Sequence, residues 1–167
     1  MGKLNWQYLA GFFDGEGTVY LSRCNKKRPN AHTFAFGIKP TISICNTKKD
    51  LLIAIKNFLL SEEIKTAGPY ENRGTFTIGV YSWDSAQRFI ERIIGYSILK
   101  HNQLEILSKA IKLHEEIKQG RQRAKGLKEY YGYFEKLSRE ISSFNGAQGI
   151  GSRTLLNAIE PYWLSKI

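Results

Sequence analysis

Two acidic residues, Asp14 and Glu16, flank a glycine near the N-terminus of the chain. Residues 6–13 carry apolar side chains at helical spacing, and the segment Gly15-Glu16-Gly17 should end that helix. Carboxylates are unfavourable at a helix C-terminus because the helix dipole is already negative there. A bound cation would compensate. One carboxylate with a backbone carbonyl suits Mg²⁺, which keeps several waters and accepts phosphate oxygens as ligands.

A metal at Glu16 would serve phosphodiester hydrolysis, because it can stabilise the leaving oxygen and activate a water. One acid is a meagre site. Gly11 and Gly15 leave a bare face on the same helix, where a second backbone can approach closely. A two-fold pair of such helices would bring two copies of Glu16 together. The ordinary alternative is a glycine C-cap beside surface acids.

The elements around this stretch follow a repeated order of helix, then strand–strand–helix twice, then further helices. Strands are predicted over 18–23, 33–45, about 70–72 and 75–81, and helices from Thr47, from Ser82, over 99–117, 127–141 and near 155–163. A capping box from Thr47 to Asp50 should start the second helix. The pattern predicts an α+β fold (αββαββα) with a four-stranded antiparallel sheet. It forms one domain over 1–167, with the core in 1–98 and C-terminal helices in 99–167.

Polar and basic side chains occupy one face of this predicted sheet. In the first strand Val19 and Leu21 point one way, and Thr18, Tyr20 and Ser22 point the other. A two-stranded ribbon fits the major groove of B-DNA, and basic hairpin tips would meet phosphates. The basic residues at these tips are Lys26, Lys27, Arg28 and Arg73. The ordinary alternative is a solvated sheet face.

The composition of the chain limits the classes of molecule that it could bind. The chain has 167 residues and a net charge of +10, which favours a polyanion, either nucleic acid or an acidic membrane. It has no apolar run of membrane-spanning length and no signal peptide pattern. We therefore expect an intracellular protein without a membrane partner, and the sequence does not indicate the compartment. Cys24 and Cys45 are expected as free thiols. Phosphate-binding loops, dinucleotide fingerprints and nucleophile elbows are absent from the sequence.

The string Leu9-Ala10-Gly11-Phe12-Phe13-Asp14-Gly15-Glu16-Gly17 resembles the defining motif of the LAGLIDADG homing endonucleases at every position which that family restricts. The resemblance extends over most of the chain and implies the single-motif, homodimeric type. It implies an intron-encoded endonuclease that hydrolyses both strands of DNA at a long, nearly palindromic site. The implied cofactor is Mg²⁺ or Mn²⁺, with Ca²⁺ as a non-catalytic substitute.

The resemblance also implies roles for individual residues. Glu16 and the carbonyl of Gly15 would bind metal, and Lys100 and Asn46 would position water or stabilise phosphate charge. The expected dimer interface comprises Tyr8, Gly11, Asp14 and Gly15, with Asp14 mainly structural. Some relatives have a second basic residue at the position that corresponds to Asp50. This chain departs from that pattern, and Lys48 or Lys49 could supply the positive charge instead. Ordinary alternatives are a surface lysine at position 100 and a helix-cap neighbour at Asn46.

The expected DNA contacts divide into base edges and backbone. The candidates for base edges are Tyr20, Ser22, Lys39, Thr41, Ser43, Arg73, Thr75 and Thr77. The turn from Asn145 to Arg153, including Ser152, would contact the DNA backbone. Two other functions stay open on the same scaffold: an intron maturase that binds RNA, and a non-catalytic DNA-binding regulator. Glu16 argues against the regulator, because a pure binding protein has no need of an acid facing phosphates.

Overall fold

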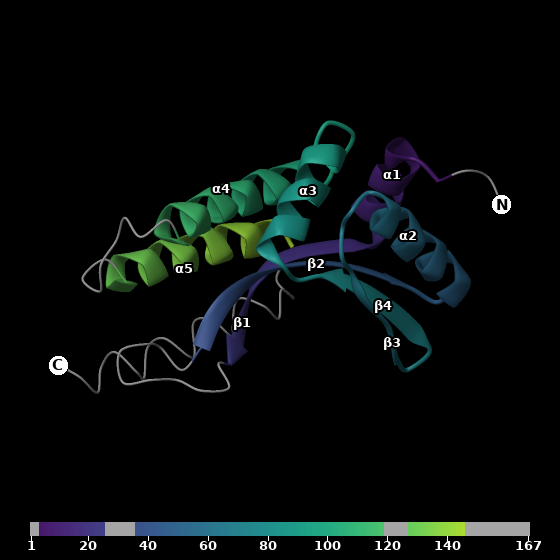
Figure 1. Ribbon diagram of the computed structural model, residues 1–167, viewed down its shortest axis with the longest axis horizontal. Coiled ribbons are helices and arrows are strands. Elements are labelled where there is room, and N and C mark those ends of the chain that lie inside the picture. Colours follow the sequence, from purple (N-terminus) through teal and green to yellow (C-terminus); the bar gives the residue numbers. More distant parts are fainter. Residues whose placement is uncertain (1–3, 26–35, 119–126, 146–167) are drawn as a thin grey trace.

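The computed structural model describes residues 4–25, 36–118 and 127–145 and shows a layer of helices over one sheet (Figure 1). The elements are α1 (Trp6–Glu16), β1 (Gly17–Asn25), β2 (Phe36–Asn46), α2 (Lys49–Ser61), β3 (Ala67–Asn72), β4 (Thr75–Val80), α3 (Trp83–Ile93), α4 (His101–Lys118) and α5 (Leu127–Phe144). The predicted order is confirmed. The helix expected near 155–163 lies outside the described residues. None of the described helices has both the length and the apolarity needed to span a bilayer.

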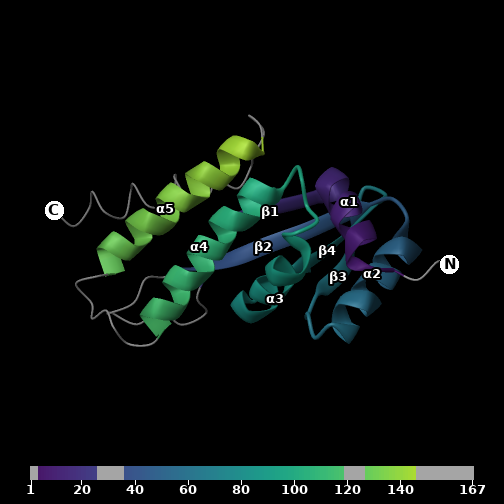
Figure 2. The same cartoon turned by 90° about the horizontal axis from the view of Figure 1, so that it is seen from above.

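The four strands form one antiparallel sheet in the order β1-β2-β4-β3. The five helices of the described residues lie on one side of this sheet, as the two perpendicular views show (Figures 1 and 2). The predicted α+β fold is therefore confirmed. The sheet is left with one face toward the helices and one face away from them.

The alternation of side chains along the strands explains this asymmetry. Val19 and Leu21 are fully buried, and Tyr20 and Ser22 between them are only partly buried. In β2 the apolar residues Ile42 and Ile44 join the same buried side. Because neighbouring residues of a strand point to opposite faces, the apolar set faces the helices and the polar set faces away.

A single hydrophobic core holds α1 against the sheet. Phe13 of α1 is fully buried and lies edge-on to Phe89 of α3, with ring centroids 5.2 Å apart. The same core includes Leu104 and Leu107 of α4 and Phe134 of α5. Burial of one such side chain contributes about 1.5–3 kcal/mol. The end of α1, with its two acids, is thus fixed relative to the sheet.

Two helices begin after residues whose side chains cap them, and the start predicted at Thr47 differs from the structure. Asn5 caps α1 by accepting the N–H of Tyr8 at 2.8 Å, and Ser82 caps α3. The predicted capping box at Thr47 is wrong: the N-cap of α2 is Lys48, without a side-chain cap bond. Asn46 Oδ1 accepts the N–H of Lys48 at 2.8 Å instead. This Asx turn directs the chain into α2 and replaces the expected hydroxyl cap.

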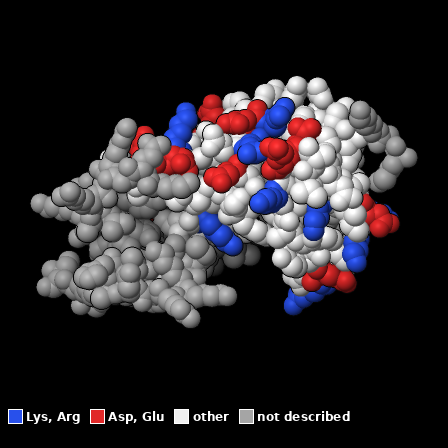
Figure 3. All heavy atoms as spheres, viewed as in Figure 1, with Lys and Arg blue, Asp and Glu red and all other residues white. Residues whose placement is uncertain are grey.

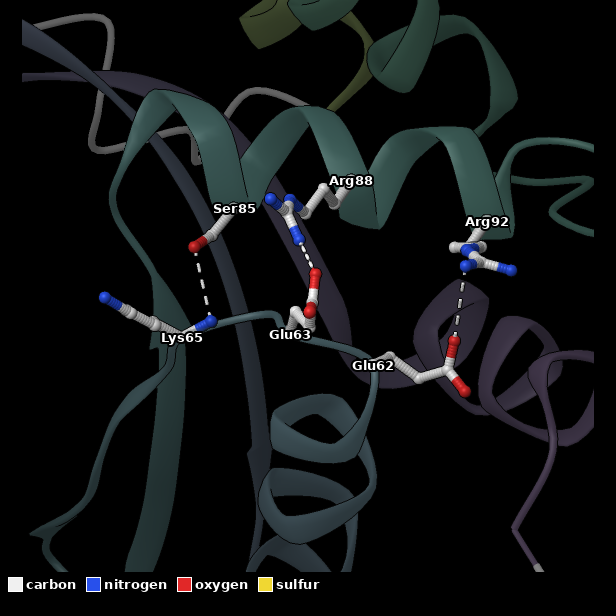
Figure 4. A network of polar contacts seen from close by, with 6 residues as sticks. All are labelled: Glu62, Glu63, Lys65, Ser85, Arg88 and Arg92. Carbon is white, nitrogen blue, oxygen red and sulfur yellow. Dashed lines mark hydrogen bonds and ion pairs between the residues drawn. The ribbon is translucent and has the colours of Figure 1, made fainter.

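Polar contacts attach the segment after α2 to α3 (Figure 4). Arg88 pairs with Glu63, and Arg92 lies 3.8 Å from Glu62. Ser85 Oγ accepts the N–H of Lys65 at 3.2 Å. Exposed ion pairs are worth about 0–1 kcal/mol each. Their main effect is to set the position of α3 along the segment that leads into β3.

The two cysteines are far apart along the hairpin. Cys24 faces Gly37 in the register of β1 and β2, eight residues along β2 from Cys45. At about 3.4 Å per residue, that separation is roughly 27 Å. Cys45 is a free thiol. The two residues therefore do not form a disulfide with each other.

Candidate functional site

Glu16 is the last residue of α1, and its side chain is exposed. It has no hydrogen-bond or ion-pair partner among the described residues. The Gly17 N–H closes the helix on the carbonyl of Phe13. The carbonyl of Gly15 belongs to the last turn, whose oxygens lack partners within the helix. A carboxylate and a carbonyl are thus available together at the junction of α1 and β1.

These groups fit a divalent cation only as part of a larger site. Within the described residues, no three or more His, Cys, Asp or Glu side chains gather in a metal-binding arrangement. Mg²⁺ is usually held by one or two protein carboxylates, waters and substrate phosphates. The chemistry of Glu16 and Gly15 fits that pattern if phosphate and a second copy of the chain supply the remaining ligands.

Asp14 is fully engaged in contacts inside the protein. Its carboxylate accepts the hydroxyl of Ser97 at 2.5 Å and the backbone N–H of Ile98 at 2.7 Å. It also accepts the N–H groups of Leu99 and Lys100, both at 3.1 Å. These four donors precede the first residue of α4. Asp14 therefore holds the turn that leads into α4 and has little capacity left for a metal.

The same contacts set the acidity of Asp14. Burial is the largest single influence and raises the pKa of Asp14. The Ser97 hydroxyl and the backbone N–H groups of residues 98–100 lower it, and together they outweigh burial. The pKa of Asp14 therefore lies below its ordinary value of 3.8. The carboxylate is therefore ionised at neutral pH, and the dipole of α4 favours a negative charge close to the start of that helix.

Lys100 and Asn46 both lie toward the end of the sheet that carries Glu16. The backbone of Lys100 is bonded to Asp14, which is two residues from Glu16. Asn46 lies two residues beyond Ile44, and Ile44 is the register partner of Gly17. The structure brings these predicted residues to one region. The Asn46 side-chain oxygen is already used in the turn before α2.

The bare face of α1 is open. A Cβ atom at Gly11 or at Gly15 would meet nothing within 4 Å. Tyr8, one turn earlier, is 50% exposed, and its ring stacks on that of Phe12. Beyond the tip of α1, the segment that Asp14 holds exposes two large apolar side chains. They are Ile98, 83% exposed, and Leu99, 72% exposed.

The polar face of the sheet differs in detail from the prediction. Ser22 and Thr41 share a hydrogen bond of 2.8 Å between their hydroxyls. Thr41 is 1% exposed and Ser43 is 8% exposed. Two expected base contacts are thus buried at the base of this face, because small side chains lie below their larger neighbours. Tyr20, Ser22 and Lys39 are the more accessible members of the same surface.

The β3–β4 hairpin carries the remaining candidates. Arg73 and Gly74 both have positive φ, 50° and 77°, as a two-residue hairpin turn of type I′ requires. The turn exposes Arg73 at the tip, and Thr75 begins β4 behind it. Thr77 Oγ1 lies 3.2 Å from Cys45 Sγ.

Asn145 has a role inside the protein rather than on a free surface. Its side-chain amide donates to the carbonyl of Val19 at 2.9 Å and so joins the end of α5 to β1. The other predicted backbone contacts of this turn, Ser152 and Arg153, lie outside the described residues. So do Lys26, Lys27 and Arg28.

The structure adds Tyr81 and Tyr70 to the polar face, which the list of predicted contacts omitted. The pKa of Tyr81 is raised by burial first, and then by the nearby Tyr20, Tyr70 and Cys45. Burial is also the main cause of the raised pKa of Tyr20. The alternation of Thr75, Thr77 and Tyr81 within the predicted strand 75–81 places Tyr81 on this face, but it does not mark a DNA contact. Gly79 was an available signal, since glycine inside a strand marks a close approach.

Charge is unevenly distributed over the visible surface (Figure 3). Acidic and basic side chains are mixed over the helical layer, and Lys and Arg predominate lower in the view, toward the sheet. The chain as a whole carries a net charge of +10. A net positive charge of this size favours polyanionic partners.

A family model described as a LAGLIDADG-like domain matches residues 4–94. That range is more than half of the chain, and it contains α1, the whole sheet and α3. Searching the curated proteins gives no match.

Solved structures of homing endonucleases share the fold. I-CvuI, in complex with its target in the presence of Ca, has a TM-score of 0.67 and 15% identity over 93% of this chain and 92% of that chain. The archaeal intron-encoded I-Vdi141I, complexed with DNA, has a TM-score of 0.64 and 19% identity over 95% and 96% of the two chains. I-SmaMI, bound to cleaved DNA, has a TM-score of 0.61 and 20% identity over 96% of this chain but only 49% of its own.

Proposed function

This chain belongs to the LAGLIDADG family, and we propose that it is a site-specific endonuclease that hydrolyses both strands of a DNA duplex. One observation carries the proposal. Of the two acids at the tip of α1, Asp14 is held by four hydrogen-bond donors, and Glu16 is exposed without a partner among the described residues. A free carboxylate beside a sheet with a polar face suits a metal that acts on phosphate.

We propose that the active form is a homodimer joined along α1. The open positions of Gly11 and Gly15 allow the backbones of two helices to approach closely. Exposed Ile98 and Leu99 supply apolar surface next to the helix tip. The chain spans about half the length of I-SmaMI. Two copies of this fold would therefore correspond to one I-SmaMI chain.

Divalent metal, Mg²⁺ or Mn²⁺, would be held by Glu16 and the carbonyl of Gly15, with Ca²⁺ as a non-catalytic substitute. When bound, such an ion stabilises the leaving oxygen and activates water for attack on phosphorus. Asp14 fixes the tip of α1 relative to α4. Lys100 would place a positive charge near the scissile phosphate, and Asn46 would orient solvent through its amide nitrogen.

DNA would bind along the sheet face that lies away from the helices. Tyr20, Ser22 and Lys39 are the accessible side chains near its centre, and Arg73, exposed at the hairpin tip, would meet a phosphate. In a homodimer the two sheets would read two half-sites related by two-fold symmetry. The expected target is a long, nearly palindromic duplex.

Selection of cleaved duplexes from a random library in the presence of Mg²⁺ tests this proposal. We expect a palindromic consensus for the native chain. Glu16→Gln should bind that consensus with unchanged affinity and cleave it at least about 100-fold more slowly, since the carboxylate that holds the metal is lost. Glu140→Gln is the matched control, because Glu140 is exposed on α5 and its side chain should not affect cleavage. Cleavage by Glu16→Gln at the native rate would contradict the metal role, and binding of intron RNA without cleavage of any duplex would favour a maturase.

A further inference from the structure

Lys39 and Tyr81 form an ordered pair on the polar face of the sheet. The ammonium of Lys39 lies 4.4 Å from the centroid of the Tyr81 ring. Lys39 belongs to β2, and Tyr81 directly follows β4. An ammonium group is attracted to the negative face of an aromatic ring. Lys39 therefore has a preferred position on this surface, unlike a surface lysine that moves freely in solvent.

The Tyr81 ring packs against a row of small residues on the sheet. Gly79 of β4 faces Ser43 of β2 on one side and Ala67 of β3 on the other. Residues that face each other in a sheet point to the same side. A Cβ atom at Gly79 would overlap the Tyr81 ring, so the ring covers the Gly79 backbone closely. Three small neighbours thus leave room for one large ring, and a side chain at position 79 would displace it.

The chemistry of the pair leaves the lysine charge available. The pKa of Tyr81 is raised, so its hydroxyl stays neutral at physiological pH and does not neutralise Lys39 as a phenolate would. Lys39 carries three N–H donors and no acceptor. Within the register it faces Ser22, whose hydroxyl is bonded to Thr41. The ammonium is therefore the dominant donor at this point of the polar face.

We propose that Tyr81 is a positioning residue that holds Lys39 as a reader of guanine in the major groove. The inference rests on the proposed function, because it assumes that this face binds duplex DNA. Guanine presents two acceptors, N7 and O6, in that groove, and adenine presents one acceptor beside a donor. A group that carries only hydrogen-bond donors, held at one point of the groove, therefore prefers guanine to adenine. A freely moving lysine would instead find phosphates, which carry no sequence information.

The test compares base preference between variants of the full-length chain. Cleaved duplexes are selected from a random library with Mg²⁺ for the native chain, Lys39→Met, Tyr81→Leu and Tyr81→Phe. We expect guanine preference at one symmetric pair of positions to fall about fivefold or more in Lys39→Met and Tyr81→Leu. Tyr81→Phe keeps the ring face and should retain the preference. The double variant should match Lys39→Met alone, because Tyr81 acts through Lys39.

A control variant, a second test variant and a stability measurement separate this role from a general loss of folding or binding. Tyr133→Leu removes a tyrosine that is 60% exposed on α5 and should leave the consensus unchanged. Gly79→Ala reaches the pair by a different route and should reproduce the effect of Tyr81→Leu, because it displaces the ring. Thermal unfolding of each variant checks that the chain is folded.

The outcomes distinguish this inference from the proposed function. A native consensus that Tyr81→Leu and Gly79→Ala both leave unchanged would overturn the role of Tyr81 alone. An equal loss of affinity for all sequences in Lys39→Met would show a phosphate contact and overturn the guanine reading. A native chain that selects no consensus at all would overturn both proposals.

Discussion

The hydroxyl of Ser97 donates to the carboxylate of Asp14 at 2.5 Å and joins two segments that are 83 residues apart in the sequence. Three backbone N–H groups from residues 98–100 complete the contact. The tip of α1 and the start of α4 therefore form one corner. Glu16 follows Asp14 by two residues at the end of α1, and the backbone of Lys100 is bonded to Asp14. Asp14 therefore links the segment of the expected metal ligand to the segment of the expected basic residue.

Asp14→Asn should destabilise this corner. An amide has one oxygen, so in either orientation its nitrogen faces at least one backbone N–H group of residues 98–100, which is also a donor. We expect the free energy of unfolding to fall by about 1–3 kcal/mol in chemical denaturation. Ser97→Ala removes a single donor and should cost less, about 0.5–1.5 kcal/mol. Equal stability of Asp14→Asn and the native chain would show that the corner contributes nothing.

The contribution of Asp14 should depend on pH in a defined direction. Its pKa in the folded chain lies below the ordinary 3.8, because the four hydrogen bonds outweigh burial. Its stabilisation is therefore complete above the unfolded pKa and is lost as the pH falls through the folded pKa. The difference in unfolding free energy between the native chain and Asp14→Asn should stay constant near neutral pH and shrink as the pH falls below about 5 and through the folded pKa, which lies below 3.8. A difference that stays constant over this range would contradict the assignment.

Much of the fold could be predicted from local patterns in the sequence. The alternation of Val19 and Leu21 with Tyr20 and Ser22 identifies β1 and its buried face, because strand periodicity is a local property. The helix starts at Asn5 and Ser82 follow from capping preferences over three or four residues. The exposed position of Glu16 follows from the end of α1 at the glycines. These signals need no knowledge of distant contacts.

The contacts of Asp14, Asn145 and Tyr81 could not be predicted in this way. The partner of Asp14 is 83 residues away in the sequence, and that of Asn145 is 126 residues away. Tyr81 contacts Lys39 of a neighbouring strand. Sequence patterns show that such residues are polar or aromatic, but the tertiary arrangement decides what they contact. The same reason explains the burial of Thr41, whose strand alternation correctly places it on the polar face but does not reveal its larger neighbours.

Gly11→Leu should separate self-association from folding. Gly11 is exposed and a Cβ atom at this position meets nothing within 4 Å, so the single chain has room for a side chain to begin here. Helix propensity should even stabilise α1 by about 0.5–0.8 kcal/mol, because leucine is a better helix former than glycine. In the dimer, however, the leucine would lie between two closely packed helices. Sedimentation should show a monomer, and chemical denaturation should show a folded chain.

Gly132→Leu is the matched control for that substitution. Gly132 is exposed in α5, and a Cβ atom there also meets nothing within 4 Å. It should leave the dimer intact. Gly17→Ala has the opposite character, because its Cβ atom would overlap Phe13 and should lower stability directly. A dimer of unchanged strength in Gly11→Leu would move the interface away from α1.

Removal of divalent metal should stop cleavage without unfolding the chain. The fold rests on an apolar core that includes Phe13 and Phe89, and the described residues contain no cluster that could hold a structural metal. A chelator should therefore abolish cleavage and leave the thermal midpoint of the protein within about 2 °C of its original value. Added Mg²⁺ should restore cleavage, whereas Ca²⁺ should support binding alone. Loss of folded structure on chelation would require a metal site with a structural role, and cleavage that persists under chelation would exclude the proposed role of Glu16.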